Sequence, residues 1–259
     1  MNSKIKKIIS KKKKSKIVCL TAYSKNIAKI LDNYCDIILV GDSMANVLYG
    51  HKNTHKITLE NMIEHTASVR LGIKKSLLVV DMPLGSYKDL NQALKNARFL
   101  IKKTKCDAVK IENFKKNYKI IDFLVKNKIS VMGHIGYTPQ FKKNFKLEGR
   151  NKKEIQKLYE QANLIEKAGA FSLVMECLTP YAAKYITKKL NIPTIGIGSS
   201  SYCDGQILVT DDMLGLSGFY PKFVKKYVSL NRLIEKAVKK YTREVKTKKF
   251  PSKKYFLNG

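Results

Sequence analysis

The sequence predicts an α/β protein built as a single (β/α)8 barrel. Eight short apolar runs alternate with longer segments of helical period, the pattern of repeated βα units around a parallel sheet. A chain of 259 residues is about the length at which such a barrel forms one domain. We therefore expect one barrel domain over residues 1–259, with a basic N-terminal segment of about residues 1–15 and a C-terminal helix and tail of about residues 230–259.

The expected strands are apolar runs of three to five residues separated by polar stretches. They lie at residues 17–20, 37–40, 77–80, 108–111, 129–132, 171–175, 194–197 and 207–209. Eight strands with helices between them fit a closed barrel better than an open doubly wound sheet.

Several segments between the strands show an apolar stripe of helical period. In residues 86–103 this stripe consists of Leu90, Leu94, Ala97 and Ile101. In residues 153–168, which end before Gly169, it consists of Ile155, Leu158, Ala162 and Ile165. Residues 230–245 form a last amphipathic helix.

The formal net charge of +31 would ordinarily indicate a polyanionic partner. Lysines account for most of it and are spread along the whole chain, whereas the arginines suited to reading phosphates and bases number only five. No nucleic-acid-binding motif accompanies the charge, so we expect no specific nucleic-acid partner. The run Lys11–Lys14 and the C-terminal "KTKKFPSKK" stay as candidates for nonspecific polyanion contact.

The remaining composition indicates a soluble protein of the cytoplasm. The longest apolar stretches fall well short of the roughly 20 residues that a membrane span needs. The basic N-terminus has no apolar core of a secretion signal. The five cysteines are odd in number and contain no C-x-x-C pair, so we expect reduced thiols rather than a metal or redox site.

Five successive strands are followed by an ionisable residue: Asp42, Asp81, Glu112, His134 and Glu176. The carboxyl ends of the strands of a parallel barrel gather on one face, where the active sites of this fold lie. One acidic residue after a strand is usually a helix cap or a solvated loop residue. Five in succession favour a functional site at the barrel mouth.

Three of these residues are suited to a metal ion. Asp42, Asp81 and Glu112 offer hard oxygen ligands without a thiolate, a set that suits Mg²⁺ or a similar cation better than zinc. Such an ion keeps water molecules or substrate oxygens in its coordination shell.

The remaining polar residues complete an enolate-forming site. Lys110 lies two residues before Glu112 on the same face of its strand, and Lys110 and Ser43 can hold a substrate carboxylate. Glu176 lies on a different strand and can act as a base. A cation next to a 2-oxo acid would stabilise the oxyanion that forms when Glu176 removes the adjacent C–H proton.

Nine motifs of this chain occur in the order and spacing of a known family: "TAYS", "VGDSMANVLYGH", "VVDMP", "VKIE", "GHIGYTPQ", "LEGR", "MECL", "IGIGSS" and "DGQILVTDDMLG". Over about residues 17–223 the sequence resembles the ketopantoate hydroxymethyltransferases of pantothenate (vitamin B5) and coenzyme A biosynthesis. The resemblance is specific because the nine motifs share one order, whereas any one of them alone would be weak evidence.

The resemblance implies a TIM barrel of the phosphoenolpyruvate mutase type, assembled as a homodecamer. It implies transfer of a hydroxymethyl group from the co-substrate 5,10-methylenetetrahydrofolate to 3-methyl-2-oxobutanoate, with one Mg²⁺ per subunit. The family's metal-site acids fall on Asp42, Asp81 and Glu112, its substrate contacts on Asp42, Ser43, Asp81 and Lys110, and its proton acceptor on Glu176. For His134 the resemblance leaves open an orienting role or a packing role.

The chain departs from the family pattern in two loops. Glycines commonly follow K-I-E in the family, whereas this chain has Asn113 and Phe114. The usual G-A-G near the seventh strand reads Gly198-Ser199-Ser200 here. Both loops belong to the expected active face, so we expect the differences to affect folate geometry or rate rather than the metal-site acids.

Two alternatives stay open. A carbon–carbon lyase acting on a 2-oxo acid would use the same fold and the same metal-site acids, although the catalytic Lys-Cys-Gly-His type loop of such enzymes is missing from the sequence. The segment "IGIGSSSYCDG" can also be interpreted as a phosphate-binding loop of the kind that barrels carry after strands seven and eight.

Overall fold

The computed structural model describes residues 2–218 and 220–257. The chain divides into two compact units, Met1–Thr210 and Asp211–Gly259, and each is described by itself. The expected single domain over residues 1–259 stays a prediction. The elements are α1 Ser3–Ser10, β1 Ile17–Thr21, α2 Lys25–Leu31, β2 Ile37–Val40, α3 Met44–Val47, η1 Thr54–Lys56, α4 Leu59–Arg70, β3 Leu77–Asp81, α5 Leu90–Thr104, β4 Ala108–Glu112, α6 Tyr118–Lys126, β5 Val131–Gly136, α7 Lys152–Lys167, β6 Ser172–Glu176, α8 Pro180–Lys189, β7 Thr194–Ile197, β8 Gly205–Leu208, α9 Thr210–Leu214, α10 Leu230–Lys246 and η2 Lys253–Tyr255.

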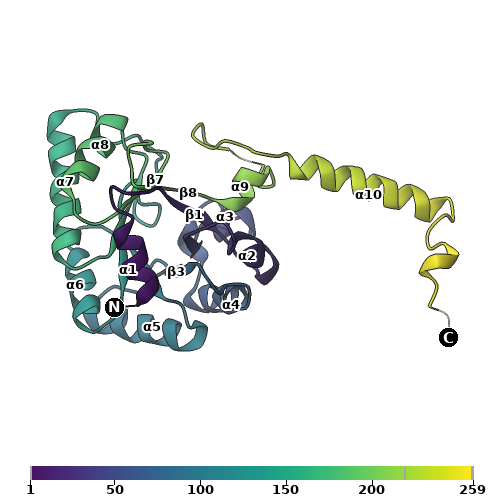
Figure 1. The fold of residues 1–259 in the computed structure, drawn as a ribbon, viewed down its shortest axis with the longest axis horizontal. Helices are drawn as coiled ribbons and strands as arrows, with labels where there is room; N and C mark the ends of the chain where they lie inside the picture. The colour runs from purple at the N-terminus through teal and green to yellow at the C-terminus, as the bar shows by residue number, and fades with distance from the viewer. Residues whose placement is uncertain (1, 219, 258–259) are drawn as a thin grey trace. The chain divides into compact units, whose positions relative to one another are not determined.

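The first unit is a closed parallel barrel. Its strands follow one another in sequence order from β1 to β8, and β8 pairs with β1 to complete the ring. Figure 1 shows helices α4 to α8 around these strands. The predicted (β/α)8 barrel is confirmed.

The strands begin and end close to the predicted apolar runs. The main differences lie at their carboxyl ends. β3, β4 and β6 each extend by one residue to include Asp81, Glu112 and Glu176. β5 spans Val131–Gly136 rather than residues 129–132, which places His134 inside the strand instead of after its end. Asp81, Glu112, His134 and Glu176 are therefore strand residues, whereas Asp42 lies in the turn after β2.

The predicted apolar stripe of the helix before β4 is confirmed in part: Ala97 is buried and Leu94 and Ile101 pack against the core, whereas Leu90 does not. Asp89 accepts a hydrogen bond from the backbone N–H of Gln92 at 2.8 Å, and this cap starts α5 at Leu90 rather than at residue 86. The fully buried face consists of Ala93, Ala97, Leu100 and Thr104, and Leu90 is 40 % exposed. In α7 the predicted stripe Ile155, Leu158, Ala162 and Ile165 is buried as expected.

The basic N-terminal segment is part of the fold. Ile5 and Ile8 of α1 are buried in a cluster with inward-facing strand residues such as Leu77 and Val79, so α1 covers one end of the barrel interior. The Nζ of Lys11 lies 2.6 Å from Asp36, and that of Lys12 lies 2.7 Å from Asp204. The hypothesis that this run contacts polyanions stays a prediction, and the structure shows that Lys11 and Lys12 are paired within the barrel.

In the second unit, α10 spans Leu230–Lys246, close to the predicted residues 230–245. None of its residues is buried. Within residues 2–218 and 220–257, no helix combines the length and apolar character that a membrane crossing needs.

Candidate active site at the carboxyl ends of the strands

Strand register brings the predicted site residues next to one another. Asp81 is paired with Lys110 across β3 and β4, and Glu112 with His134 across β4 and β5. Glu176 is paired with Gly136 across β5 and β6. Gly136 has φ +92°, and an added Cβ would lie 2.1 Å from the carbonyl oxygen of Glu176. Only glycine therefore allows β5 to approach Glu176 this closely.

Asp42, Asp81 and Lys110 form the centre of this site. The Nζ of Lys110 lies 2.7 Å from Oδ1 of Asp81, and the backbone N–H of Asp42 donates to Oδ2 of Asp81 at 3.0 Å. All three residues are at most 5 % exposed. The two carboxylates and the ammonium group are thus withdrawn from bulk water, where their mutual interactions are strong.

The pKa values in this cluster reflect an excess of negative charge. Burial raises the pKa of Asp42 well above its usual range, and the neighbouring Asp81 and Glu112 raise it further. Burial also raises the pKa of Glu112 to about 8, although Lys110 acts to lower it. For Lys110, burial by itself would lower the pKa, but the surrounding carboxylates outweigh it and the pKa is raised. One ammonium group does not balance three carboxyl groups.

His134 links the cluster to Glu176. Its Nε2 lies 3.2 Å from Oε2 of Glu176, and its Nδ1 lies 3.5 Å from both Lys110 Nζ and Glu112 Oε1. Burial lowers the pKa of His134, and Lys110 lowers it further, so the ring is neutral. The ring proton fits on Nε2, where it points to the carboxylate of Glu176. Nδ1 then has no proton and faces the ammonium group of Lys110, which can only donate. An orienting role for His134 stays a prediction, which its 3.2 Å separation from Glu176 supports.

Glu176 differs from the other carboxylates in its access to solvent. Its side chain is 15 % exposed, compared with 1 % for Glu112 and 3 % for Asp81. Burial raises its pKa, while the hydrogen bond from His134 acts to lower it. Glu176 is therefore the more exposed carboxylate of this group.

Ser43 lies directly after Asp42, at the start of α3. Its Oγ is 2.9 Å from the hydroxyl oxygen of Tyr23, which is only 6 % exposed. Tyr23 comes from the "TAYS" segment after β1 and was not among the predicted site residues. The tyrosine fixes the orientation of the serine hydroxyl.

Gln140 is a site residue that the sequence reasoning missed. Its Nε2 donates to Asp42 Oδ2 at 2.8 Å, and its backbone N–H donates to Glu112 Oε2 at 3.0 Å. Its Oε1 in turn accepts a hydrogen bond from the buried hydroxyl of Tyr87. The only signal in the sequence was its place at the end of the "GHIGYTPQ" motif.

The donor set fits a hard divalent cation. Oε1 of Glu112 is buried and has no hydrogen-bond partner among the described residues. Asp42, Asp81 and Glu112 offer only oxygen atoms, and their charge exceeds that of Lys110, so a cation would compensate it. Among the described residues, however, no group of three or more acidic, histidine or cysteine side chains is placed so that it could hold a metal ion, so the fit concerns the type of ligand atom and the charge and not the positions of the three carboxylates.

The two loops that depart from the family pattern lie after β4 and β7. The ring of Phe114 stacks on Phe141, the residue after Gln140, with centroids 4.5 Å apart. The Ser199 hydroxyl donates to the carbonyl of Met175 at 2.7 Å and accepts from the backbone N–H of Leu178 at 3.1 Å. The serine of the alternative phosphate loop is thus used to fasten that loop to the end of β6.

Sequence comparison relates this chain to one family over nearly its whole length. The profile described as "Ketopantoate hydroxymethyltransferase" matches residues 2–253. A 3-methyl-2-oxobutanoate hydroxymethyltransferase of Pelagibacter ubique is 52 % identical over 255 residues, which cover 98 % of this chain and 99 % of the relative. The enzyme of the same name from Bartonella quintana is 47 % identical. The match covers 95 % of this chain and 90 % of the relative.

Similar solved structures support the fold alone, because their sequences are at most 13 % identical to this chain. A 2,3-dimethylmalate lyase, described as a member of the PEP mutase/isocitrate lyase superfamily, has a TM-score of 0.63 and covers 100 % of this chain and 93 % of its own. A phosphoenolpyruvate phosphomutase from Streptomyces platensis subsp. rosaceus has a TM-score of 0.65, with coverages of 95 % and 87 %. A phosphonopyruvate hydrolase complex with oxalate and Mg²⁺ has a TM-score of 0.62, with coverages of 98 % and 93 %.

Proposed function

The chain belongs to the ketopantoate hydroxymethyltransferase family, and we propose that the strand ends from β2 to β6 carry out that family's reaction. The activity is that of a 3-methyl-2-oxobutanoate hydroxymethyltransferase, which produces ketopantoate (2-dehydropantoate) for pantothenate biosynthesis. As the donor we propose 5,10-methylenetetrahydrofolate. The observation that carries the assignment of the site is the buried cluster of Asp42, Asp81, Lys110 and Glu112 next to the more exposed Glu176.

The cationic and hydroxyl groups of the cluster bind the substrate. Lys110 remains protonated because carboxylates surround it, so it supplies a fixed positive charge for the carboxylate of the 2-oxo acid. The Ser43 hydroxyl, oriented by Tyr23, donates a second hydrogen bond. Asp81 holds the ammonium group of Lys110, Asp42 is bonded to Asp81 through its backbone N–H, and both complete the substrate contacts.

Glu176 is the base. Its carboxylate removes the proton from C3 of 3-methyl-2-oxobutanoate, and neutral His134 holds the carboxylate in one orientation. One water molecule hydrolyses the N–CH2–N bridge of the co-substrate, which breaks both C–N bonds and releases tetrahydrofolate and formaldehyde. The carbanion carbon then adds to the formaldehyde carbon as its C=O π bond breaks, and the proton held by Glu176 passes to the resulting alkoxide, which becomes the hydroxyl group of the product.

Asp42, Asp81 and Glu112 would hold the Mg²⁺, one ion per subunit. The bound cation supplies positive charge against the negative charge that develops on the 2-oxo group when C3 loses its proton. Gln140 keeps Asp42 and Glu112 in place through its two hydrogen bonds.

An assay coupled to tetrahydrofolate formation tests this function. Ketopantoate should form from 3-methyl-2-oxobutanoate and 5,10-methylenetetrahydrofolate, the rate should fall to background with a chelator, and added Mg²⁺ should restore it. Asp81→Ala should remove the metal-dependent rate without unfolding the barrel, because Asp81 is the last residue of β3. Full activity of Asp81→Ala at saturating Mg²⁺ would overturn the metal assignment.

A carbon–carbon lyase is the alternative activity, and it is less well supported. Lyases occur among the structural neighbours, but only at 13 % identity, where the likeness concerns the fold. The relatives at 47–52 % identity are all named as hydroxymethyltransferases.

A further inference from the structure

The hydroxyl group of Ser43 is held by residues that lie outside the carboxylate cluster. Ser43 lies at the N-terminal end of α3, and its Oγ is 2.9 Å from the hydroxyl oxygen of Tyr23. α3 has only four residues, so its own backbone hydrogen bonds give it little stability. The orientation of the Ser43 hydroxyl therefore depends on contacts that fix this short helix and the tyrosine from outside.

His65 of α4 contacts the backbone of Tyr23. Its Nδ1 lies 2.8 Å from the carbonyl oxygen of Tyr23. A carbonyl oxygen can only accept a hydrogen bond, so Nδ1 carries the proton. With a neutral imidazole Nε2 is then an acceptor, and the hydroxyl of Tyr49, 3.0 Å away, donates to it. His65 thus joins two segments of the chain, one through each ring nitrogen.

The contact with Tyr49 completes a closed set of contacts around α3. The helix ends at Val47, and Tyr49 follows two residues later. α3 is consequently held on both sides, at Ser43 by the hydroxyl of Tyr23 and beyond Val47 by the hydrogen bond between Tyr49 and His65. We call Tyr23, Ser43, Tyr49 and His65 the α3 clamp.

The helix that carries His65 is a firm support. Met62 and Val69, three residues before and four residues after His65 on the same face of α4, are buried in the hydrophobic core. On the other side of the clamp, an added Cβ at Gly41 would lie 2.9 Å from Oγ of Ser43. The side chain of Ser43 is therefore confined between the packed helix and the chain at Gly41.

We propose that His65 is a positioning residue for the 2-oxo acid substrate and acts on the Ser43 hydroxyl through the α3 clamp. The inference rests on the proposed binding of the substrate carboxylate by Ser43 and Lys110. The ammonium group of Lys110 supplies charge but little direction, whereas a hydroxyl group held in one position supplies a directed hydrogen bond. The position of the carboxylate in turn sets where C3 of the substrate lies relative to Glu176.

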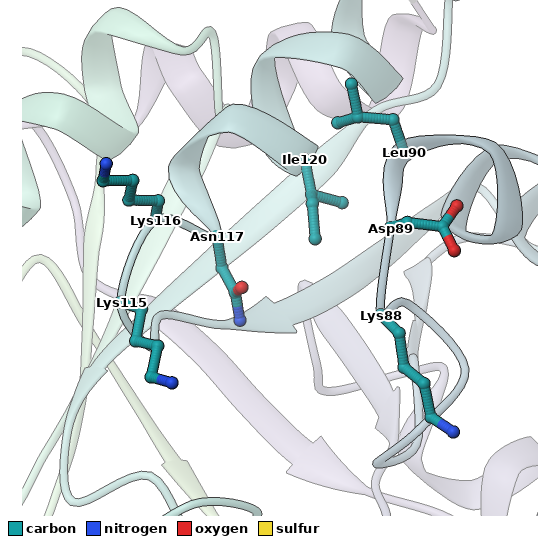
Figure 2. A pocket seen from close by; sticks show the side chains of 7 residues that line it. All are labelled: Lys88, Asp89, Leu90, Lys115, Lys116, Asn117 and Ile120. Carbon is teal, nitrogen blue, oxygen red and sulfur yellow. The ribbon is translucent and has the colours of Figure 1, made fainter.

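A cavity of about 680 Å³ between the loops that follow β3 and β4 offers other cations for the substrate carboxylate. Figure 2 shows Lys88 and Lys115 among the residues that line it. Both lysines are exposed, whereas Lys110 is only 5 % exposed and is held by Asp81 at 2.7 Å. A buried, fixed donor positions a small acid better than an exposed lysine does, so the geometry favours Lys110 and Ser43.

The test measures the Kd of 3-methyl-2-oxobutanoate by calorimetry with Mg²⁺ and without folate, so that no turnover occurs. His65→Ala should raise this Kd about three- to tenfold, as for the loss of one hydrogen bond. His65→Asn places an amide nitrogen near the position of Nδ1 and should recover most of the affinity. Ser68→Ala is the matched control, because Ser68 lies on the same helix and accepts the backbone N–H of Lys25 at 3.1 Å. It should leave the Kd unchanged.

A double-mutant cycle separates positioning of Ser43 from a general loss of stability. In a Ser43→Ala background, His65→Ala should change the Kd by less than about twofold, because the hydroxyl through which His65 acts is gone. Tyr49→Phe is the milder variant, since it removes only the hydroxyl that donates to Nε2. It should raise the Kd in the same direction as His65→Ala.

Four results would overturn the proposal. The first is an unchanged Kd in His65→Ala, and the second is an equal rise in His65→Ala and Ser68→Ala. The third is a full further loss of affinity when His65→Ala is added to Ser43→Ala. In the fourth, only Lys88→Ala/Lys115→Ala raises the Kd, which would place the carboxylate in the cavity. A wild-type protein that binds no 3-methyl-2-oxobutanoate would overturn the proposed substrate together with the role of His65.

Discussion

Among the carboxylates at the strand ends, Glu176 differs from the others in its burial and in its neighbours, and these differences suit it to act as the base. Asp42, Asp81 and Glu112 are almost completely buried and lie near Lys110, whereas Glu176 is more exposed and contacts neutral His134. A cation-binding role suits the first group and proton transfer suits the second. The two roles are separated because the cation-binding residues come from the ends of β2, β3 and β4, whereas the base comes from the end of β6.

The rate of proton exchange should rise with pH because Glu176 acts in its ionised form. Burial raises the pKa of Glu176 above the ordinary 4.5, so the carboxylate forms over a higher pH range than in a free glutamate. The measurement is the pH profile of C3 deuterium exchange in 3-methyl-2-oxobutanoate without folate. A rate that falls as the pH is raised above 4.5 would show that the protonated form is the active one.

Sequence reasoning found the ionisable residues of the site but not the neutral ones that orient them. Asp81 and Glu176 stood out because a charged residue ending an apolar strand needs an explanation. Gln140, Tyr87 and Tyr23 lie in loops, where no periodicity marks a contact. Their roles depend on loop paths that bring Gln140 to Asp42 across a sequence distance of 98 residues.

At the scale of elements, Asp32 fastens the end of α2 to the chain before β3. Its carboxylate accepts the backbone N–H groups of Lys74 at 2.9 Å, Lys75 at 3.0 Å and Ser76 at 2.7 Å. Burial alone would raise the pKa of Asp32, but these hydrogen bonds outweigh it and the pKa is lowered. The stabilisation is therefore present above the ordinary pKa of 3.8 and is lost as the pH falls below it.

Asp32→Ala should lower the free energy of unfolding by about 3 kcal/mol, because it removes charge-assisted hydrogen bonds and leaves N–H groups without partners. Chemical denaturation at neutral pH measures the change. Asp122→Ala is the matched control, since Asp122 forms an exposed pair with Lys126 on α6 and should cost less than about 0.5 kcal/mol. Equal losses in the two variants would contradict the anchoring role of Asp32.

The strands were predictable and some helix starts were not, for physical reasons. The buried parallel strand β2 is apolar throughout and β3 is apolar up to its last residue, Asp81, so composition alone locates them. The start of α5 depends on a capping bond from Asp89, and the preceding residues 86–88 carry no signal against a helix. A stripe counted from residue 86 therefore selected Leu90 instead of Ala93.

At the scale of the whole molecule, the charge of the N-terminal segment misled the sequence reasoning. A run of lysines suggests a solvated tail, but Ile5 and Ile8 draw α1 onto the barrel and Lys12 is then paired with Asp204. Composition reports the number of charges and not their partners. The closure of the barrel, by contrast, was predictable because eight βα units leave few other arrangements.

We propose that the chain assembles as the homodecamer that the family resemblance implies. Apolar side chains of α10 are exposed, including Leu233, Ile234, Val238 and Tyr241. The net charge of +31 opposes association by repulsion that salt screens. Sedimentation at low and high ionic strength should show the decamer, favoured at high salt, and a monomer under both conditions would exclude it.

The most direct test of the site is C3 deuterium exchange in Glu176→Gln. The amide keeps the size and hydrogen bonding of the side chain but cannot accept the proton, so exchange should fall about 10²–10⁴-fold while substrate and Mg²⁺ affinity change little. Asp81→Ala is the contrasting variant and should weaken both exchange and substrate-linked Mg²⁺ binding. Exchange at the wild-type rate in Glu176→Gln would contradict the account and make His134 the next candidate for the base.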